Sequence, residues 1–272
     1  MSDLQAPSPV SPPVALTIAG SDSSGGAGIQ ADCKTMEACG VFATTALTSV
    51  NAGNTRGVER THLVPVEELD AQIDAVLDDF ELRAAKTGML ATTESIETVV
   101  GYADRLPNLV VDPVMVTAAG DRLLKPAAEK AYDDLIATAR VVTPNAEEAA
   151  VLTGIEPTPD GGRRAAGEAI VDMGAEAALV KGGHLPGDEV VDVLVTDDRV
   201  ERFRHPRIDT DVTHGAGCTL SSALTAYLAR KHDLIEAVEA SLDFVADAIQ
   251  QPLDIGEGPG SVQHLVQQRN TE

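Results

Sequence analysis

Residues 208–224 read IDTDVTHGAGCTLSSAL and place a glycine-rich turn directly before the apolar periodicity of a helix. The backbone N–H groups of such a turn, together with a helix N-terminus, form a site for an anion. Cys218 would lie at the positive end of the helix macrodipole, where a thiolate is favoured. A turn that holds negative charge beside an activatable side chain indicates phosphoryl transfer. Taken alone, a flexible helix start with a buried cysteine explains the segment equally well.

The composition predicts a folded domain with an aliphatic core. Apolar residues make up 43% of the 272 positions, whereas aromatic residues make up 3% and tryptophan is absent. No run of about 18 apolar residues occurs, so the sequence predicts no membrane span. Cys33, Cys39 and Cys218 form no C-x-x-C pair, which argues against a disulfide framework and a structural zinc site.

The N-terminal sequence MSDLQAPSPVSPP is rich in proline and has neither the basic region nor the apolar run of a signal peptide. We expect residues 1–13 to form a disordered tail. Residues 14–265 show no long linker and no internal repeat, and we expect them to form a single domain. These features favour a cytoplasmic protein.

Acidic residues outnumber basic ones along the whole chain. The formal net charge is −23 and the isoelectric point lies near 4.4. The chain therefore lacks the basic footprint of a nucleic-acid-binding protein. The acids are spread through expected helices such as 66–80 rather than gathered in a tail. A folded domain with this dispersed acidic surface is typical of adaptation to high salt, where counterions screen the self-repulsion.

Short β-rich runs alternate with amphipathic helical stretches, which predicts an α/β domain with a mostly parallel sheet and helices on both faces. The expected strands are Val14–Ala19, Thr44–Val50, Ala84–Gly88, Leu109–Asp112, Val141–Pro144 and Ala178–Gly182. The expected helices cover 28–39, 66–80, 94–105, 126–138, 146–153, 161–173, 218–230 and 234–250. Residues 189–208 alternate around Asp197-Asp198 and predict an antiparallel hairpin at the edge of the sheet.

A glycine-rich loop, GSDSSGGAGIQAD at residues 20–32, follows the first expected strand. Its G-x-G-x-x-A pattern invites a dinucleotide-binding interpretation. That fingerprint needs an acidic residue at the end of the second strand, where residues 46–52 read ALTSVNA, so the sequence does not favour it. The alternatives are a substrate-facing loop in which Asp22 or Asp32 accepts a hydroxyl group, and a capped helix start.

Polar side chains follow three further expected strands, at the sheet edge where open α/β folds bind ligands. Asp112 could order a phosphate or the water around Mg²⁺, or it could simply be a turn residue before proline. Asn145 is a natural N-cap, and Glu148 one turn later could hold hydrated Mg²⁺. Lys181 ends a buried strand before two glycines, which suits a point charge on nucleotide phosphates. No P-loop pattern is present, which excludes a P-loop kinase.

Together these segments resemble the ribokinase-like superfamily, and within it the hydroxymethylpyrimidine/phosphomethylpyrimidine kinase branch. The matching blocks occur in family order over roughly residues 14–260: ALTIAGSDSSGGAGIQAD, KTGML, VVDPVM, TPNAEEA, VKGGH and THGAGCTLSSAL. The resemblance implies a three-layer α/β/α ribokinase-like fold and a cytoplasmic homodimer that uses Mg·ATP, with the need for a monovalent cation left open. It implies phosphorylation of 4-amino-5-hydroxymethyl-2-methylpyrimidine, and then of its monophosphate to the diphosphate, in thiamine biosynthesis.

The resemblance also implies roles for individual residues. The amides of Gly215, Ala216 and Gly217 would form the anion hole, and Cys218 stands where most relatives in the superfamily carry an aspartate base. The ATP phosphates and Mg²⁺ would be served by Asp112, Asn145, Glu148, Lys181 and Thr213, with Asp112 and Glu148 holding the metal through water. The pyrimidine would lie near Gly20, Asp32, Gly53, Met89 and Val114.

One position departs from the family pattern. Relatives carry Gln or Glu before Asn-Thr at the end of the second strand, and that side chain binds the polar edge of the pyrimidine. Here residues 50–55 read VNAGNT, which puts Gly53 at the recognition position. Asn51, Asn54 or a water could compensate, or the site could accept another hydroxymethyl heterocycle. The alternatives are a pyridoxal/pyridoxine kinase of the same branch and a non-catalytic sensor that binds a pyrimidine or nucleotide.

The dispersed acidic residues predict that the protein unfolds more easily in dilute buffer than in molar salt. About 1 M KCl shortens the Debye length to about 3 Å and so removes much of the self-repulsion between surface carboxylates. The melting temperature, followed by circular dichroism, should rise between dilute buffer and molar KCl. A melting temperature that stays constant across this range would contradict the adaptation to high salt.

Overall fold

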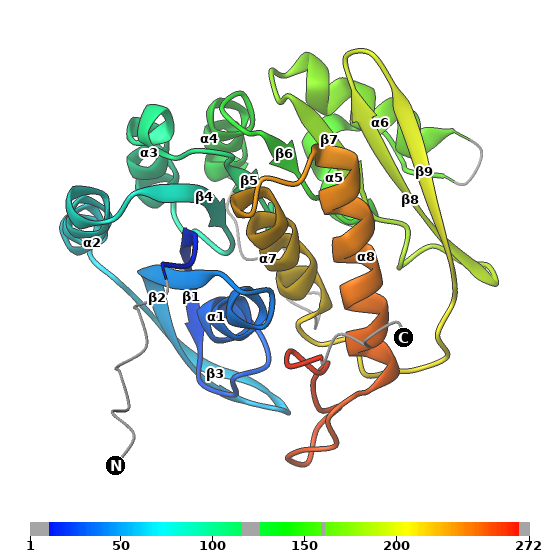
Figure 1. The fold of residues 1–272 in the computed structure, drawn as a ribbon, viewed down its shortest axis with the longest axis horizontal. Coiled ribbons are helices and arrows are strands. Elements are labelled where there is room, and N and C mark those ends of the chain that lie inside the picture. The colour runs from blue at the N-terminus through cyan, green and yellow to red at the C-terminus, as the bar shows by residue number, and fades with distance from the viewer. Residues whose placement is uncertain (1–10, 116–125, 159–160, 267–272) are drawn as a thin grey trace, which may run out of the picture.

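A sheet of nine strands organises the described part of the chain, which comprises residues 11–115, 126–158 and 161–266 of the computed structural model (Figure 1). The strand order is β3-β2-β1-β4-β5-β6-β7-β8-β9. Strands β2, β1, β4, β5, β6 and β7 are parallel, whereas β3, β8 and β9 pair antiparallel at the two edges. The bounds are β1 Val14–Asp22, β2 Phe42–Asn54, β3 Gly57–Leu63, β4 Leu82–Thr87, β5 Val110–Val111, β6 Val141–Val142, β7 Ala177–Val180, β8 Glu189–Thr196 and β9 Val200–Pro206.

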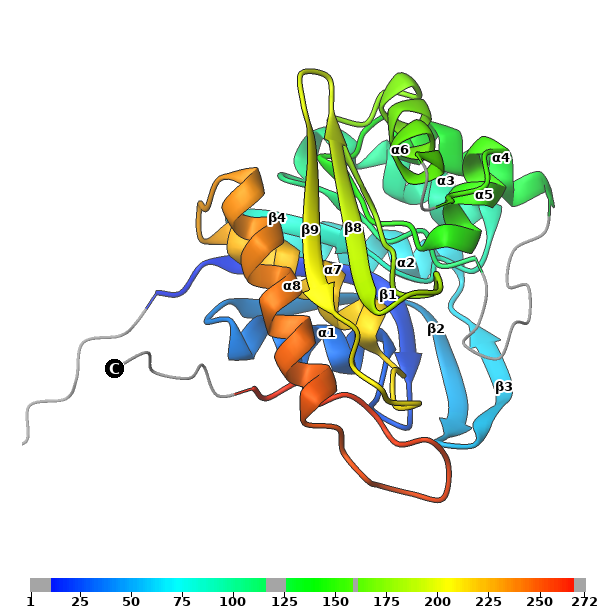
Figure 2. The ribbon, with the colours of Figure 1, turned by 90° about the vertical axis from the view of Figure 1, so that its right-hand side faces the viewer.

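Helices cover both faces of this sheet and make a three-layer α/β/α domain. Helices α1, α7 and α8 pack on one face, and α2, α3, α4 and α6 pack on the other (Figures 1 and 2). A short 3₁₀ turn, Ala103–Arg105, follows α3. The helices are α1 Gly28–Ala38, α2 Val66–Asp79, α3 Thr93–Gly101, α4 Pro126–Ile136, α5 Ala146–Thr153, α6 Gly162–Asp172, α7 Ala216–Ala229 and α8 Leu234–Gln250.

The central strand β1 is apolar on both faces because helices cover both of them. Ala15 points into the cluster formed with α1, α7 and α8, while Leu16 and Ile18 contribute to the cluster formed with α2 and α3. Each of these three side chains is completely buried. The run VALTIA therefore reads as almost continuously hydrophobic rather than alternating.

Helix α7 lies in the interior along most of its length, and every residue from Thr219 to Ala229 is buried. Its neighbours are α8, α1 and strand β4. A helix that is apolar nearly all round is stable only where it is surrounded by other elements. The N-terminus of α7, where the glycine-rich turn precedes it, is therefore held firmly relative to the sheet.

The alternation of strands and helices predicted from sequence is confirmed, with boundary shifts of a few residues at most of the expected elements. The antiparallel edge hairpin is confirmed as β8 and β9, which turn at residues 197–199 (Figure 2). Strand β2 is longer than expected, because it continues from Val50 to Asn54 with its outer edge paired to β3.

Strand β3 was not predicted from the sequence. Its residues, GVERTHL, are all exposed and show no regular apolar alternation. Hydrophobic periodicity detects strands that bury one face, and β3 buries neither. Its pairing with β2 comes from backbone hydrogen bonds and a tight turn after Asn54.

Residues 1–10 of the expected Pro-rich tail lie outside the described residues, so the tail stays a prediction. The described helices include none that combines the length and the apolar character needed to cross a bilayer.

Candidate active site

The carboxyl ends of the parallel strands meet at the N-terminus of α7. Asp112 follows β5 and Lys181 follows β7, and the Nζ atom of Lys181 lies 3.3 Å from Oδ1 of Asp112. Ser221 of α7 donates from Oγ to Oδ2 of the same carboxylate over 3.1 Å. Asp112 therefore ties two strand ends to the first turns of α7. This is the sheet edge at which open α/β folds bind their ligands.

The turn before α7 can exist only with glycine at position 215. Gly215 adopts a left-handed conformation with φ of 85°, and a Cβ there would collide with the carbonyl oxygen of Gly26. The N–H of Ala216 donates to Thr213 O over 3.0 Å. Within the described residues, the N–H groups of Gly215, Gly217 and Cys218 have no acceptor. These three amides are open to an anion, whereas the N–H of Ala216, which was expected among them, is already paired with Thr213 O.

A cation stands beside these open amides. A Cβ built on Gly217 would lie 3.6 Å from Nζ of Lys181. Burial alone would lower the pKa of Lys181, but the carboxylates of Asp112 and Glu148 outweigh it and raise the pKa above its ordinary value. Lys181 is therefore charged at neutral pH, and the turn combines a positive side chain with a helix N-terminus.

Glu148 belongs to a capping box and is also an unusual acid. Asn145 accepts from the N–H of Glu148 over 2.9 Å, and Glu148 accepts from the N–H of Asn145 over 2.8 Å. The cap is thus confirmed for Asn145. Glu148 is only 5% exposed. Burial raises its pKa to about 7, with the nearby charge of Lys181 opposing the rise and that of Asp112 adding to it.

The structure corrects the expectation that Cys218 carries a depressed pKa. Its thiol is half-buried at the start of α7. Burial raises its pKa to about 12, and the charges of Asp32 and Asp112 add to the rise against the opposing effect of Lys86. Desolvation therefore outweighs the helix dipole, and the resting side chain is a neutral thiol.

Asp32 also lies elsewhere than expected. Its carboxylate is completely buried beneath the site and accepts from Nζ of Lys86 (2.7 Å), Oγ1 of Thr17 (2.6 Å) and Oγ of Ser222 (2.7 Å). With these three partners inside the core, Asp32 is an internal structural acid and does not face a ligand. The expected contact between Asp32 and the pyrimidine is thus not supported by its position.

Gly20 and Met89, both expected near the substrate, do come together. A Cβ on Gly20 would lie 2.7 Å from Cε of Met89 and 2.6 Å from Oγ of Ser49. The carbonyl oxygen of Gly20 in turn faces Gly28 at the start of α1. Val114 lies in the turn after β5, where its N–H donates to the carbonyl oxygen of Asp112 over 2.8 Å.

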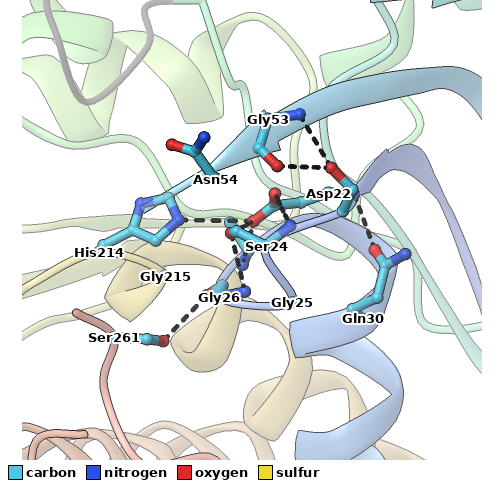
Figure 3. A network of polar contacts seen from close by, with 12 residues as sticks. Asp22, Ser24, Gly25, Gly26, Gln30, Gly53, Asn54, His214, Gly215 and Ser261 are labelled. Carbon is cyan, nitrogen blue, oxygen red and sulfur yellow. Dashed lines mark hydrogen bonds and ion pairs between the residues drawn. The ribbon is translucent and has the colours of Figure 1, made fainter. Parts of the chain in front are cut away.

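The loop between β1 and α1 is docked onto both β2 and the turn before α7 (Figure 3). Oγ of Ser23 donates to Gly53 O (2.7 Å) and accepts from Gly53 N (2.8 Å). The Asp22 carboxylate lies 3.5 Å from Nε2 of His214 and accepts from the N–H groups of Ser24 and Ala27. Burial opposes its ionisation, yet the hydrogen bonds from these partners hold the pKa of Asp22 well below its usual range.

Two residues that lie next to the candidate active site were not predicted from the sequence. Lys86 is completely buried and lies in the expected strand 84–88, where the argument already applied to Lys181 would have found it. The second is His264, whose ring lies beside Gly26 and Gly215 and whose pKa is lowered to about 4 by burial. No local pattern signals this contact, because it joins the C-terminal segment to the first loop.

Comparisons with known proteins agree with this arrangement. A model of the phosphomethylpyrimidine kinase family matches residues 22–263. The hydroxymethylpyrimidine/phosphomethylpyrimidine kinase of Rhizobium meliloti is 46% identical over 93% of this chain and 97% of its own length. The crystal structure of phosphomethylpyrimidine kinase from Clostridium difficile has a TM-score of 0.78 at 41% identity, covering 87% of this chain and 99% of that one.

A pyridoxal kinase from Staphylococcus aureus in complex with AMP-PCP and pyridoxal is also similar, with a TM-score of 0.88 at 32% identity over 96% of both chains. The fold, the cationic lysine and the open helix N-terminus at the strand ends define a phosphotransferase of the ribokinase-like class. Within that class, the chain belongs to the phosphomethylpyrimidine kinase family.

The buried ion pair beneath the site predicts a large loss of stability when one partner is removed. Lys86→Met leaves the Asp32 carboxylate buried without its cation and should lower the free energy of unfolding by about 3–5 kcal/mol. Arg56→Ala breaks the exposed pair between Arg56 and Glu257 and serves as the control, with an expected loss of about 1 kcal/mol or less. Urea unfolding in molar KCl measures both.

Equal losses in the two variants would contradict a structural role for the buried pair. If Lys86→Met does not fold, the double variant Lys86→Met/Asp32→Asn removes both charges and should recover part of the stability.

The raised pKa of Glu148 predicts that stability falls as the pH rises from about 4.5 to about 7. In this window the folded protein keeps the proton while the unfolded chain has lost it, so a rising pH favours unfolding. Glu148→Gln keeps an acceptor for the Asn145 N–H but cannot lose a proton. Between pH 5 and pH 8 the free energy of unfolding of this variant should therefore fall by less than that of the wild type, with a difference on the order of 1–3 kcal/mol. Urea unfolding of both proteins at several pH values measures this, and parallel curves would contradict it.

Proposed function

We propose that this protein phosphorylates the hydroxymethyl group of 4-amino-5-hydroxymethyl-2-methylpyrimidine with ATP, and then converts the monophosphate to the diphosphate, in thiamine biosynthesis. The observation that carries the proposal is the Lys181 ammonium beside the open amides at the start of α7, in a chain of the phosphomethylpyrimidine kinase family. Relatives named for both kinase activities support the two steps. Phosphoryl transfer depends mainly on positioning and charge stabilisation, which this arrangement supplies.

The residues of the turn would act on the transferred phosphoryl group. The N–H groups of Gly215, Gly217 and Cys218 would donate to its oxygens, and the positive end of α7 favours the negative charge there. Lys181, kept cationic by Asp112, would stabilise the charge that spreads over those oxygens in the transition state. Gly20 and Met89 would contact the ring that carries the acceptor hydroxyl.

The residues at the strand ends fit a nucleotide with its metal ion. A similar solved kinase carries AMP-PCP, which supports ATP as the donor. Asp112 and Glu148 would hold Mg²⁺ through water, and Asn145 and Thr213 would adjoin the phosphates. The donor set fits the ion, because a cation would relieve the repulsion that helps to raise the pKa of Glu148, and Mg²⁺ keeps most of its waters. When bound, the metal neutralises charge on the phosphates.

Cys218 has a proposed role that differs between the two steps. In the first step the acceptor is an alcohol that must lose its proton, and the deprotonated Cys218 thiolate at the turn would receive it. In the second step the acceptor is already an anionic phosphate and needs no base. Because the resting thiol has a pKa of about 12, the first step would become faster as the pH rises.

We also propose that the protein is a homodimer and is located in the cytoplasm. All seven residues of β3 are exposed, and this edge strand carries Val58 and Leu63 beside the equally exposed Val50 of β2. An exposed edge strand with apolar side chains is a surface that proteins normally cover. A second copy of the chain is the proposed cover, and light scattering that gives only the monomer mass would contradict it.

The pyridoxal/pyridoxine kinase alternative is favoured by one observation, the glycine at position 53, together with the similarity to pyridoxal kinases of known structure. The sensor alternative is disfavoured because a protein that only binds needs neither the charged Lys181 nor the buried Glu148 at the strand ends.

The proposed function is tested by offering the purified protein Mg·ATP in high-potassium buffer with three substrates in parallel. These are the hydroxymethylpyrimidine, its monophosphate and pyridoxine, with products separated by mass. Diphosphate formed from the monophosphate supports the proposal. Turnover of pyridoxine alone would establish the alternative kinase, and absence of turnover with all three would favour the sensor. A repeat without potassium tests the monovalent cation.

Cys218→Ala should slow the first phosphorylation much more than the second, by on the order of 100-fold against a few-fold, because only the first acceptor must lose a proton. Initial rates with each acceptor, measured from pH 6 to pH 9, separate the two steps. Cys218→Ser keeps a polar side chain and controls for packing. Equal losses in both steps would refute the role of Cys218 as the base.

A further inference from the structure

Two side-chain oxygen atoms on β2 are buried without a hydrogen-bond partner. Oγ of Ser49 and Oδ1 of Asn51 are shielded from solvent, and neither contacts a donor or acceptor within the described residues. A buried polar atom without a partner costs roughly 1–3 kcal/mol of stability, so such atoms are rare in folded proteins. Here two of them lie two residues apart on one strand, which indicates that something other than the protein completes their hydrogen bonds.

Both side chains face the place where Gly20 and Met89 meet. Residues separated by two positions lie on the same face of a strand, and a Cβ on Gly20 would lie 2.6 Å from Oγ of Ser49 and 3.5 Å from Nδ2 of Asn51. Gly20 also contacts Gly28, whose backbone N–H faces the Cys218 sulfur. We call Ser49 and Asn51 the polar corner; two glycines, Gly20 and Gly28, connect it to Cys218 at the start of α7.

Position 53 has no room for a side chain that could contact the same place. A Cβ on Gly53 would lie 3.0 Å from Gly57 O and 3.3 Å from Cα of Val58, so a side chain there would press against β3. The pairing with β3 is also irregular at this point, since the register shifts between Ala52 and Gly53. Oγ of Ser23 occupies both backbone groups of Gly53. The backbone at position 53 is therefore committed to holding the first loop.

Asn54 is committed as well. Its Oδ1 accepts from the N–H of Arg56 over 2.9 Å and so forms the turn between β2 and β3, and the residue is exposed. Of the two asparagines near Gly53, Asn51 is thus the one whose acceptor is both buried and unpaired.

We propose that the Asn51 side chain, with Ser49 beside it, recognises the polar edge of the substrate ring. A primary amide presents one acceptor and two donors side by side. An aminopyrimidine presents an amino donor on the carbon next to a ring-nitrogen acceptor, and the two patterns can form a pair of parallel hydrogen bonds. The identity of the ring rests on the proposed function, whereas the role of Asn51 rests on its geometry.

The same amide distinguishes the two candidate rings. In pyridoxine the ring nitrogen and the phenolic oxygen are separated by the methyl-bearing carbon, so one amide cannot pair with both. A site that hydrogen-bonds one edge pattern rejects a ring that lacks it, because its own buried polar atoms would stay unpaired. Asn51 therefore selects the aminopyrimidine although position 53 is glycine.

The test compares Asn51→Ala with Asn54→Ala, an exposed asparagine three residues along the same strand. Calorimetric binding of the aminopyrimidine and kcat/KM for both phosphorylations are measured on the full-length protein. Asn51→Ala should weaken binding and lower kcat/KM by on the order of 10- to 100-fold, while Asn54→Ala changes either by less than about twofold. Asn51→Asp, which keeps the acceptor but loses the donor, should fall between the two.

Melting temperatures and the affinity for AMP-PCP report whether the fold and the nucleotide site are intact. In Asn51→Ala the melting temperature should not fall, because the oxygen that is removed is unpaired, and the affinity for AMP-PCP should be unchanged. Equal effects of Asn51→Ala and Asn54→Ala on aminopyrimidine binding would overturn the proposal, as would a wild-type protein that does not bind the aminopyrimidine. If the wild type binds the ring through Asn51 but transfers no phosphate to it, the proposed function fails while the recognition role stands.

Discussion

The active-site end of this domain depends on one buried ion pair, between Lys86 of β4 and Asp32 of α1. The carboxylate also accepts from Thr17 of β1 and Ser222 of α7, so one acid joins two strands and two helices. Burial alone would lower the pKa of Lys86, but the carboxylates of Asp32 and Asp112 raise it, so the pair stays charged. An ion pair inside a core tolerates little displacement, because either charge alone is costly there. The start of α7 is therefore held in place from below.

The charged residues of the candidate active site lie at the ends of the strands, above this ion pair. Asp112 keeps Lys181 charged and also accepts from Ser221, so the cation and the helix start are positioned by the same carboxylate. The first loop approaches from the other side, where a Cβ on Gly215 would collide with the carbonyl oxygen of Gly26 and a Cβ on Gly26 would collide with the His214 ring. Ser23 and Asp22 then fasten this loop to β2 and His214 (Figure 3). The residues proposed to recognise the substrate and to bind the phosphoryl group thus belong to one connected set of contacts.

Sequence reasoning predicted the features that depend on local order. The alternating strands and helices, the edge hairpin, the Asn145 cap and the position of Lys181 at the end of a buried strand all follow from periodicity, capping chemistry or strand polarity. Prediction from the sequence failed where the role of a side chain depends on partners that are distant along the chain. The sequence indicates a ligand-facing acid at Asp32, but in the structure Lys86 and Ser222 bind its carboxylate. The sequence indicates a thiolate at Cys218, but burial raises the pKa of the thiol more than the helix dipole lowers it. Strand β3 was not predicted because it buries neither face. The sequence also could not show whether Asn51 or Asn54 is available to a ligand, because that depends on which side-chain amide the turn between β2 and β3 already uses.

The length of chain between the partners of Asp32 has a consequence for how the protein is made. Ser222 is 190 residues away from Asp32, and Gly215 must meet Gly26 across a similar span. Contacts of such high sequence separation form late in folding, because a long loop must close before they can contribute. A nascent chain emerging from the ribosome can pair its first strands well before α7 exists. The catalytic end of the molecule is therefore assembled last, when the sheet that supports it is already in place.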